Sequence, residues 1–138
     1  MPALDQCHAQ IVRALEKSGW KVSSKPYVLY IASQRRVYID IHAYREIGDN
    51  NQQLIIVEVK CFGDDRTELS DLYTAIGQYI LYRNWLKTLA IKDELYLAIP
   101  TRIYNNIILP LATAVVRENR VKMILVDLEQ ETIDRWME

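Results

Sequence analysis

The sequence of 138 residues has little of what would set it apart from ordinary folded proteins: two cysteines, four glycines, four prolines and one phenylalanine. Two cysteines are too few for a disulfide framework, and in a reducing compartment we expect Cys7 and Cys61 to remain thiols. No apolar run approaches the roughly 20 residues of a membrane helix, and the first residues lack the basic and apolar regions of a signal peptide. We therefore expect a cytoplasmic protein without a membrane segment.

An excess of charge of one sign is also absent. Seventeen Lys and Arg residues oppose eighteen Asp and Glu residues, which leaves a net charge of −1. Without net positive charge, tight non-specific binding to nucleic acid is not expected unless a partner assists. Half of the residues are apolar and a quarter are charged, a composition typical of folded chains. The length fits a single domain over 1–138, and we find no repeat or long linker.

Apolar periodicity and turn residues predict an alternation of helices and strands. The segment 54–60 is almost continuously apolar, as in a central strand that is covered on both sides. The expected ranges are 5–18, 70–89 and 103–118 for helices, and 20–22, 27–31, 37–42, 54–60, 95–99, 122–128 and 132–136 for strands. This order predicts an α/β fold in which a central mixed sheet, an antiparallel meander extended by βαβ crossovers, is flanked by helices.

Local signals refine these elements. Asp5 is expected to cap the first helix, Ser70 or Asp71 the second, and Pro110 is expected to kink the third. The alternating segment 37–42 is expected to place Val37, Ile39 and Ile41 on one face. The core-facing stripe of the second helix is expected to consist of Leu72, Tyr73, Ile76, Tyr79 and Ile80.

Charged residues interrupt two of the apolar strands at Asp40, Glu58 and Lys60. Glu58 and Lys60 are two residues apart on one strand, so their side chains share a face. Two charges on an otherwise apolar face are costly unless they are paired or belong to a site. If the strands at 37–42 and 54–60 pair across the intervening turn, Asp40 approaches Glu58.

Converging carboxylates suit a hard divalent cation. We expect Asp40, Glu58 and the Val59 carbonyl to bind Mg²⁺ or Mn²⁺ weakly, because few protein ligands are available and water fills the remaining positions. Such a cation polarises a phosphate and activates a water, while Lys60 positions that water or stabilises the developing charge. Gln78, in the second helix, is a further candidate for orienting a water or a phosphate.

Each of these residues also has a simpler interpretation. A Glu-x-Lys sequence at a strand end is common, and the pair is usually a solvated ion pair worth about 0–1 kcal/mol. A lone helical glutamine such as Gln78 is more often a surface or cap contact. Residues that are potential phosphate ligands, but equally normal at a surface, are Arg35, Arg36, Arg66 and Arg83.

Eight segments in order along nearly the whole chain carry a family resemblance: 5–8, 14–20, 38–40, 56–62, 70–83, 94–99, 122–127 and 133–136. The blocks IVEVKCF at 56–62 and SDLYTAIGQYILYR at 70–83 are the most specific of them. In these segments the sequence resembles the XisH family, the fdxN-element excision controlling factors of cyanobacteria.

The resemblance implies a nuclease-like core of the PD-(D/E)XK superfamily, of the restriction-endonuclease or tRNA-endonuclease type. Asp40 then matches the motif Asp, Glu58 and Lys60 match the (D/E)xK pair, and Gln78 matches the helical glutamine of several branches. Ile39 departs from the pattern, since it stands where the motif name has proline. The resemblance also implies control of a DNA excision together with a site-specific recombinase and an XisI-type companion.

Two functions follow as hypotheses: a Mg²⁺-dependent nuclease, or a non-hydrolytic factor that uses the same fold to bind a protein or DNA. The intact motif favours the first, and the near-zero net charge favours the second or a nuclease that depends on a partner. An edge strand at 132–136 that carries Trp136, and the tyrosine-bearing helix at 70–89, predict a homodimer and a complex with the companion. The alternative is that Trp136 folds back onto the core and the chain is a monomer.

Overall fold

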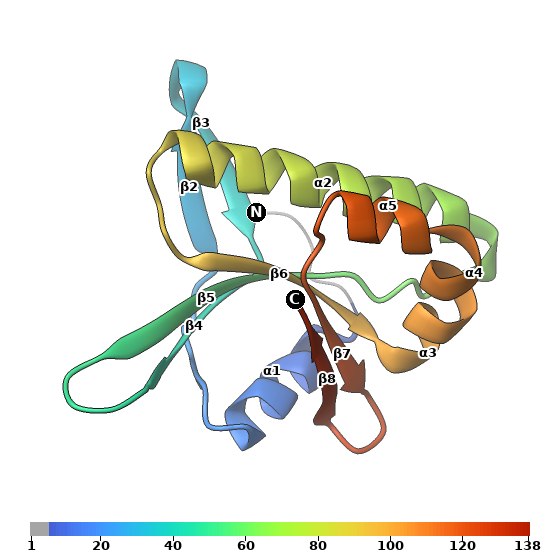
Figure 1. Cartoon of the computed structure of the whole chain (residues 1–138), viewed down its shortest axis with the longest axis horizontal. Helices are drawn as coiled ribbons and strands as arrows, with labels where there is room; N and C mark the ends of the chain where they lie inside the picture. The colour runs from blue at the N-terminus through green and yellow to red at the C-terminus, as the bar shows by residue number, and fades with distance from the viewer. Residues whose placement is uncertain (1–5) are drawn as a thin grey trace.

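The computed structural model describes residues 6–138, apart from the side chain of Ser33, and contains a six-stranded mixed sheet and a separate two-stranded ribbon (Figure 1). The ribbon pairs β2 (Tyr27–Ile31) with β3 (Arg35–Ile39) antiparallel. The strands of the larger sheet lie in the order β1 (Lys21–Val22), β4 (Ile41–Glu46), β5 (Gln52–Val59), β6 (Glu94–Pro100), β7 (Met123–Asp127) and β8 (Thr132–Met137). Because β5, β6 and β7 run parallel and the outer pairs antiparallel, the expected mixed α/β architecture is confirmed.

Helices cover both faces of the larger sheet (Figure 1). On one face lies α1 (His8–Lys17), and on the other lie the long α2 (Glu68–Thr88) and the short α5 (Thr113–Glu118). Two 3₁₀ turns, η1 (Ala32–Gln34) and η2 (Asp65–Thr67), precede β3 and α2. Asp5, the expected cap of α1, lies outside the described residues, and Cys7 occupies the N-cap position.

The helical segment after β6 is more irregular than the single kinked helix expected. The chain forms α3 (Thr101–Ile103), a π-helical turn η3 (Tyr104–Ile108) and α4 (Leu109–Leu111), and then breaks at Ala112, where φ is −139°. Proline has no N–H, and its ring clashes with the carbonyl four residues earlier. The disturbance expected at Pro110 is therefore present, but it is distributed over the wide turn before the proline and the break after it.

The alternation of side chains along the central strands builds two apolar cores, one on each face of the sheet. In β5, Ile56 belongs to the core beneath α2, whereas Ile55 and Val57 belong to the core beneath α1. Glu58, two residues after Ile56, consequently points to the α2 face of the sheet.

The strand expected at 37–42 is divided at Asp40. Ile39 lies in the core beneath α2 and Ile41 in the core beneath α1, because the chain leaves the ribbon after β3 and enters the larger sheet as β4. The prediction that Val37, Ile39 and Ile41 share one face is therefore wrong. The change of sheet places Asp40 at the junction.

The buried stripe of α2 also differs from the expectation. Tyr73 is 68% exposed, and the buried residues of the helix are Leu72, Ala75, Tyr79, Tyr82 and Leu86. Apolar residues occur all around this helix, so periodicity alone does not select the face that packs. The helix begins at Glu68 with Thr67 as its N-cap residue, so neither Ser70 nor Asp71 caps it.

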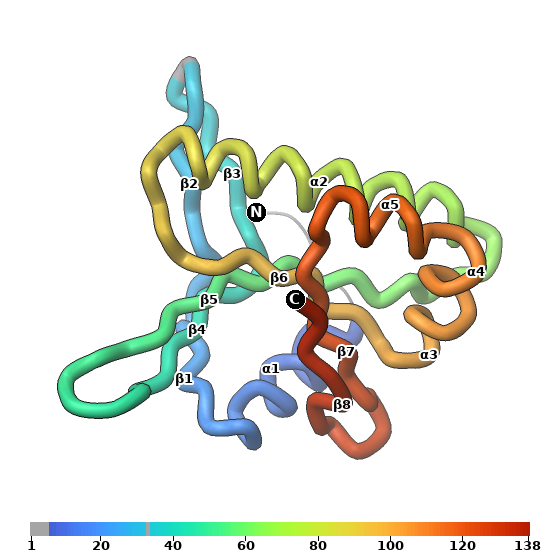
Figure 2. Tube along the Cα trace, viewed as in Figure 1, coloured from blue at the N-terminus to red at the C-terminus, as the bar shows by residue number. Residues whose placement is uncertain are grey.

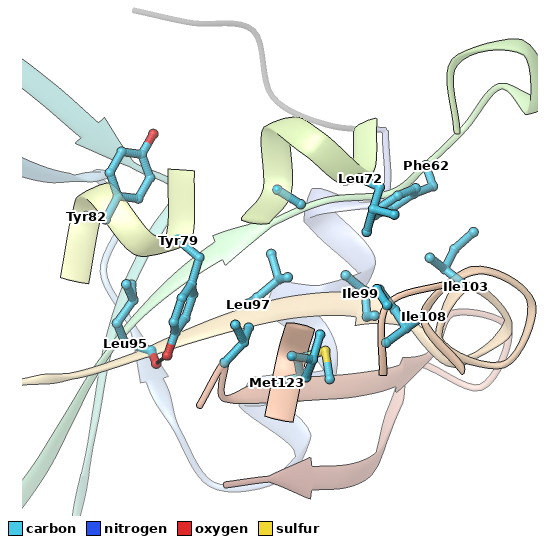
Figure 3. Close-up of a cluster of buried hydrophobic side chains, with 14 of the residues drawn as sticks. Phe62, Leu72, Tyr79, Tyr82, Leu95, Leu97, Ile99, Ile103, Ile108 and Met123 are labelled. Carbon is cyan, nitrogen blue, oxygen red and sulfur yellow. Dashed lines mark hydrogen bonds between the residues drawn. The ribbon is translucent and has the colours of Figure 1, made fainter. Parts of the chain in front are cut away.

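Tyr79 fixes α2 to the parallel part of the sheet. Its hydroxyl donates a hydrogen bond to the Leu95 carbonyl at 2.9 Å and accepts one from the Lys122 N–H at 3.1 Å. Figure 3 shows the Tyr79 ring reaching from α2 down to Leu95, while the Tyr82 side chain on the same helix points away from Leu95. One side chain of α2 therefore bonds to residues of β6 and of the segment that enters β7.

The two cysteines form a disulfide, so the expectation that Cys7 and Cys61 remain thiols is wrong for this structure. They are 54 residues apart in sequence, but the packing of α1 against β5 brings their Cα atoms to 5.8 Å. The Cys7 N–H also donates to the Cys61 sulfur at 2.9 Å. The bond ties the start of α1 to the residue that follows Lys60.

β7 and β8 form the expected terminal hairpin, in which β8 is an edge strand. Trp136 is half-buried and packs against Trp20 and Tyr96, with ring centroids 5.7 and 5.1 Å apart. The tryptophan thus folds back onto the core beneath α1, so Trp136 offers little free surface for a second copy. The backbone edge of β8 stays available for pairing.

Candidate functional site

Asp40 and Glu58 meet because of the register between β4 and β5. Ile41 is opposite Val57 in this antiparallel pair, so the next position along the ladder brings Asp40 opposite Glu58. The Asp40 N–H donates to Glu58 Oε1 at 3.4 Å, and the Val59 N–H donates to Asp40 Oδ2 at 2.8 Å. The predicted approach of the two carboxyl groups is confirmed, and each is held by a backbone group of the other strand.

Lys60 completes the cluster. Its Nζ lies 3.7 Å from Glu58 Oε2, and the side chains of the two residues are 18% and 6% exposed, respectively. The Lys60 N–H donates to the Ala98 carbonyl at 3.0 Å, which continues the pairing with β6 and fixes the backbone below the side chain. Because both side chains are largely buried, the Glu58–Lys60 pair is not the solvated ion pair of the simpler interpretation.

The carboxyl group of Glu58 is strongly perturbed. Burial first, and then the negative charge of Asp40, raise its pKa to about 8, while the Lys60 ammonium acts in the opposite direction. At neutral pH without a bound cation, Glu58 therefore carries a proton. A divalent cation would lower the pKa of Glu58, because its positive charge offsets the effects of burial and of the Asp40 carboxylate.

We expect Glu58→Gln to be more stable than the wild type at neutral and alkaline pH. The unfolded Glu58 ionises near 4.5 and the folded residue near 8, so the wild type loses stability as pH rises through this window, by roughly 2 kcal/mol between pH 6 and pH 8. The amide cannot ionise and avoids the loss. Urea unfolding at several pH values, without divalent cations, measures the difference.

The matched control for this measurement is Glu118→Gln, which neutralises an exposed glutamate on α5. Its stability should follow the pH dependence of the wild type. If the Glu58→Gln curve also runs parallel to the wild-type curve, Glu58 is ionised in the folded protein and its pKa is not raised by burial.

The helix α2 passes over the carboxyl pair. The pKa of Tyr82 is raised by burial and by the charges of Glu58 and Asp40, which places its hydroxyl within their field. Gln78 lies one turn earlier, on the same side of α2 as Tyr82; it is half-buried, and its Oε1 is buried without a hydrogen-bond partner in the described part of the chain. Sequence reasoning did not select Tyr82, although its i, i+4 spacing from Gln78 was the available signal.

A cavity of about 730 Å³ adjoins Lys60. It is lined by Gln6, by Lys60 and the loop that follows to Thr67, and by Asp71 and Thr74 of α2. Lys60 is the cluster residue that reaches this cavity, since Asp40, Glu58 and Gln78 are not part of its lining. Arg66, one of the candidate phosphate ligands, lies in the same wall but is paired with Asp64 at 3.2 Å.

The donor set fits a divalent cation bound with water. Asp40 and Glu58 supply carboxylate oxygens and Val59 supplies a carbonyl, the hard ligands that Mg²⁺ and Mn²⁺ accept. Within residues 6–138 no group of three or more His, Cys, Asp and Glu side chains is placed to hold a metal. A cation at this cluster would therefore keep several waters.

Together, these features define a mixed α/β protein with a buried cluster of two carboxyl groups and a lysine where an antiparallel hairpin meets parallel strands. The family model of the XisH protein matches residues 1–134. The chain belongs to the XisH family.

Two crystal structures resemble the fold. An XisH family protein from Nostoc punctiforme PCC 73102 is 34% identical with a TM-score of 0.84, over 97% of this chain and 100% of that chain. A fdxN element excision controlling factor protein from Anabaena variabilis is 33% identical with a TM-score of 0.81, over 95% of this chain and 97% of that chain. A comparison of the sequence with curated proteins found no match. No helix among the described residues is long and apolar enough to cross a membrane.

Proposed function

We propose that this protein is a controlling factor for the site-specific excision of a DNA element and that it carries a Mg²⁺-dependent endonuclease site. The observation that supports the site most strongly is the buried convergence of Asp40, Glu58 and Lys60 from a strand junction and its neighbouring strand. The order Asp, then Glu-x-Lys, on a mixed sheet flanked by helices fits the restriction-endonuclease-like core. The family membership and the Anabaena variabilis relative support the role in excision.

In this proposal each residue of the cluster has a separate role in hydrolysis. Asp40, Glu58 and the Val59 carbonyl hold Mg²⁺ or Mn²⁺, which supplies the charge that polarises a phosphodiester and activates a water. The Lys60 ammonium stabilises negative charge that develops on the phosphate. Gln78, whose Oε1 has no hydrogen-bond partner among the described residues, orients a water or a phosphate. The protein holds these groups in a place from which bulk water is largely excluded, where electrostatic effects are strongest.

The cation should bind to wild type and fail to bind to Asp40→Asn. We expect millimolar affinity without nucleic acid, because few protein ligands are available among the described residues and one carboxyl group must first lose a proton. Isothermal titration calorimetry with Mn²⁺ measures both proteins, and Asp71→Asn, an acid in the wall of the neighbouring cavity, is the control. Equal heats for wild type and Asp40→Asn would rule out the proposed cation site.

A second function, binding without hydrolysis, is favoured by one observation. The net charge of −1 gives little overall attraction to DNA, so a role as a binding factor for a partner protein fits the same fold. The absence of metal-dependent cleavage by wild type, together with a specific complex with an XisI-type companion, would select this function.

We expect a homodimer in solution and a complex with the XisI-type companion, and in the cell a joint action with a site-specific recombinase. The open edge of β8 offers backbone groups for pairing, and exposed apolar residues of α2, among them Leu69, Tyr73 and Leu81, offer a second surface. Size-exclusion chromatography with light scattering, on the protein alone and mixed with the companion, tests both. A monomeric mass at micromolar concentration and no shift on mixing would contradict the expectation.

A further inference from the structure

Although the net charge of the whole chain is −1, one segment of it is basic. Between Glu16 and Asp40 the chain contains no acidic residue. The cations in this stretch are Lys17, Lys21, Lys25, Arg35 and Arg36. A segment of this length without a single Asp or Glu, in a chain with more acids than bases, marks one region as attractive to a polyanion.

The β2–β3 ribbon presents part of this segment to solvent. Tyr27, Ile31 and Val37 pack against the core beneath α2, so the opposite face of the ribbon points outward. The register places Tyr30 opposite Arg36 and Val28 opposite Tyr38 on this outward face. Tyr30 is 65% exposed. An exposed face of tyrosine and arginine is the composition that contacts sugar, phosphate and base.

The two arginines at the tip are available for a ligand. Arg35 and Arg36 are exposed, and neither guanidinium has an ion-pair or hydrogen-bond partner in the part of the chain that the structure describes. By contrast, Arg66 is paired with Asp64, and Arg83 donates to backbone carbonyls after α5. Of the four arginines that the sequence offers as phosphate ligands, Arg66 and Arg83 are therefore bonded to other groups of the protein, whereas Arg35 and Arg36 have no such partner in the described part of the chain.

The ribbon leads directly into the carboxyl cluster. β3 ends at Ile39 and Asp40 is the next residue, so Arg36 is four residues from Asp40, or roughly 13 Å along an extended strand. That length corresponds to about four base-pair steps of a duplex. In Figure 2 the hairpin crosses α2 and its tip projects beyond the helix, free of the larger sheet.

We propose that the β2–β3 ribbon is a duplex-DNA contact, in which Arg36 and Tyr30 on the outward face hold the DNA next to the Asp40–Glu58 cluster, together with Arg35, which lies opposite Ile31 on the other face at the tip. The proposal rests on the proposed function in taking DNA as the substrate. A two-stranded ribbon fits the major groove of B-form DNA, whereas the major groove of A-form RNA is too narrow for protein side chains to read. The basic ribbon also explains how a chain of net charge −1 gains affinity for DNA locally.

Fluorescence anisotropy with a labelled DNA duplex, in EDTA and at several salt concentrations, tests the proposal. For Arg35→Ala/Arg36→Ala we expect an affinity loss of at least about tenfold at low salt, and a salt slope smaller by about 2, since two phosphate contacts are removed. The control Arg102→Ala/Arg117→Ala removes the same charge from exposed positions on α3 and α5 and should change affinity less than about twofold. Arg35→Lys/Arg36→Lys should restore most of the binding.

Three results would overturn the proposal: no binding by wild type, equal losses in the two alanine pairs, or displacement of DNA by polyglutamate at equal charge. The last result would indicate an acidic protein as the partner. Because EDTA removes the cation, the measurement does not depend on cleavage. Ribbon-dependent binding by a protein that never cleaves would overturn the nuclease alone, and Lys60-dependent cleavage with ribbon-independent binding would overturn the ribbon alone.

Discussion

Lys60→Ala is expected to abolish metal-dependent DNA cleavage, with a loss of roughly a thousandfold or more, while the free energy of unfolding changes by no more than about 1 kcal/mol. The activity falls because the ammonium that stabilises charge on the phosphate is removed. The stability is retained because Glu58, with its pKa raised to about 8, carries a proton at neutral pH. Removing Lys60 therefore leaves a neutral carboxyl group and avoids an unpaired buried charge.

Supercoiled plasmid, single-stranded circles and branched duplexes with millimolar Mn²⁺ are suitable substrates for this test. Lys87→Ala, in the last turn of α2, is the charge-matched control and should cleave like wild type. A large drop in melting temperature for Lys60→Ala, together with no cleavage of any substrate by wild type, would show that the Glu58–Lys60 pair is structural.

Reduction of the Cys7–Cys61 disulfide is expected to lower the free energy of unfolding by about 4 kcal/mol. The bond closes a loop with a sequence separation of 54 residues, and chain entropy in the unfolded state grows by about this amount when a loop of that length is opened. Both cysteines are buried, so the two sulfurs must move apart within the core when the bond is reduced, and this adds to the entropic loss of stability.

Urea unfolding with and without a reductant measures this effect, and Cys7→Ser/Cys61→Ser should be insensitive to the reductant. Identical midpoints for oxidised and reduced wild type would contradict the expectation. A protein kept in a reducing compartment would lack this stabilisation, so the redox state of the cell compartment sets how rigidly the start of α1 is joined to the residue after Lys60.

The sequence predicted the alternation of helices and strands because the central strands have clear apolar runs and turn residues separate the elements. It also predicted that Asp40 approaches Glu58, since a hairpin register follows from the pattern of two strands. It failed at Asp40 itself, where one apparent strand is divided between a ribbon and a sheet, because alternation continues through the junction. The same ambiguity affected α2, in which the exposed Tyr73 is the same residue type as the buried Tyr79 and Tyr82.

Other features depend on tertiary packing that no local pattern records. The disulfide joins cysteines that only the packing of α1 on β5 brings together. The shifted pKa of Glu58 depends on its burial and on the distance to Asp40, and the position of Tyr82 over the cluster depends on which face of α2 packs. The candidate site was therefore predictable in its residue types and only partly in its surroundings.

The topology of the sheet also predicts an order of folding. The hairpins β2–β3, β4–β5 and β7–β8 close over short turns, whereas the parallel pairs of β5, β6 and β7 must close the long connections 60–93 and 101–122. Local hairpins form fast, and long loop closures are slow. We therefore expect the carboxyl groups of Asp40 and Glu58 to meet early, while both are still hydrated. Because burial under α2 raises the pKa of Glu58 to about 8, we expect completion of the fold at neutral pH to be coupled to the uptake of a proton.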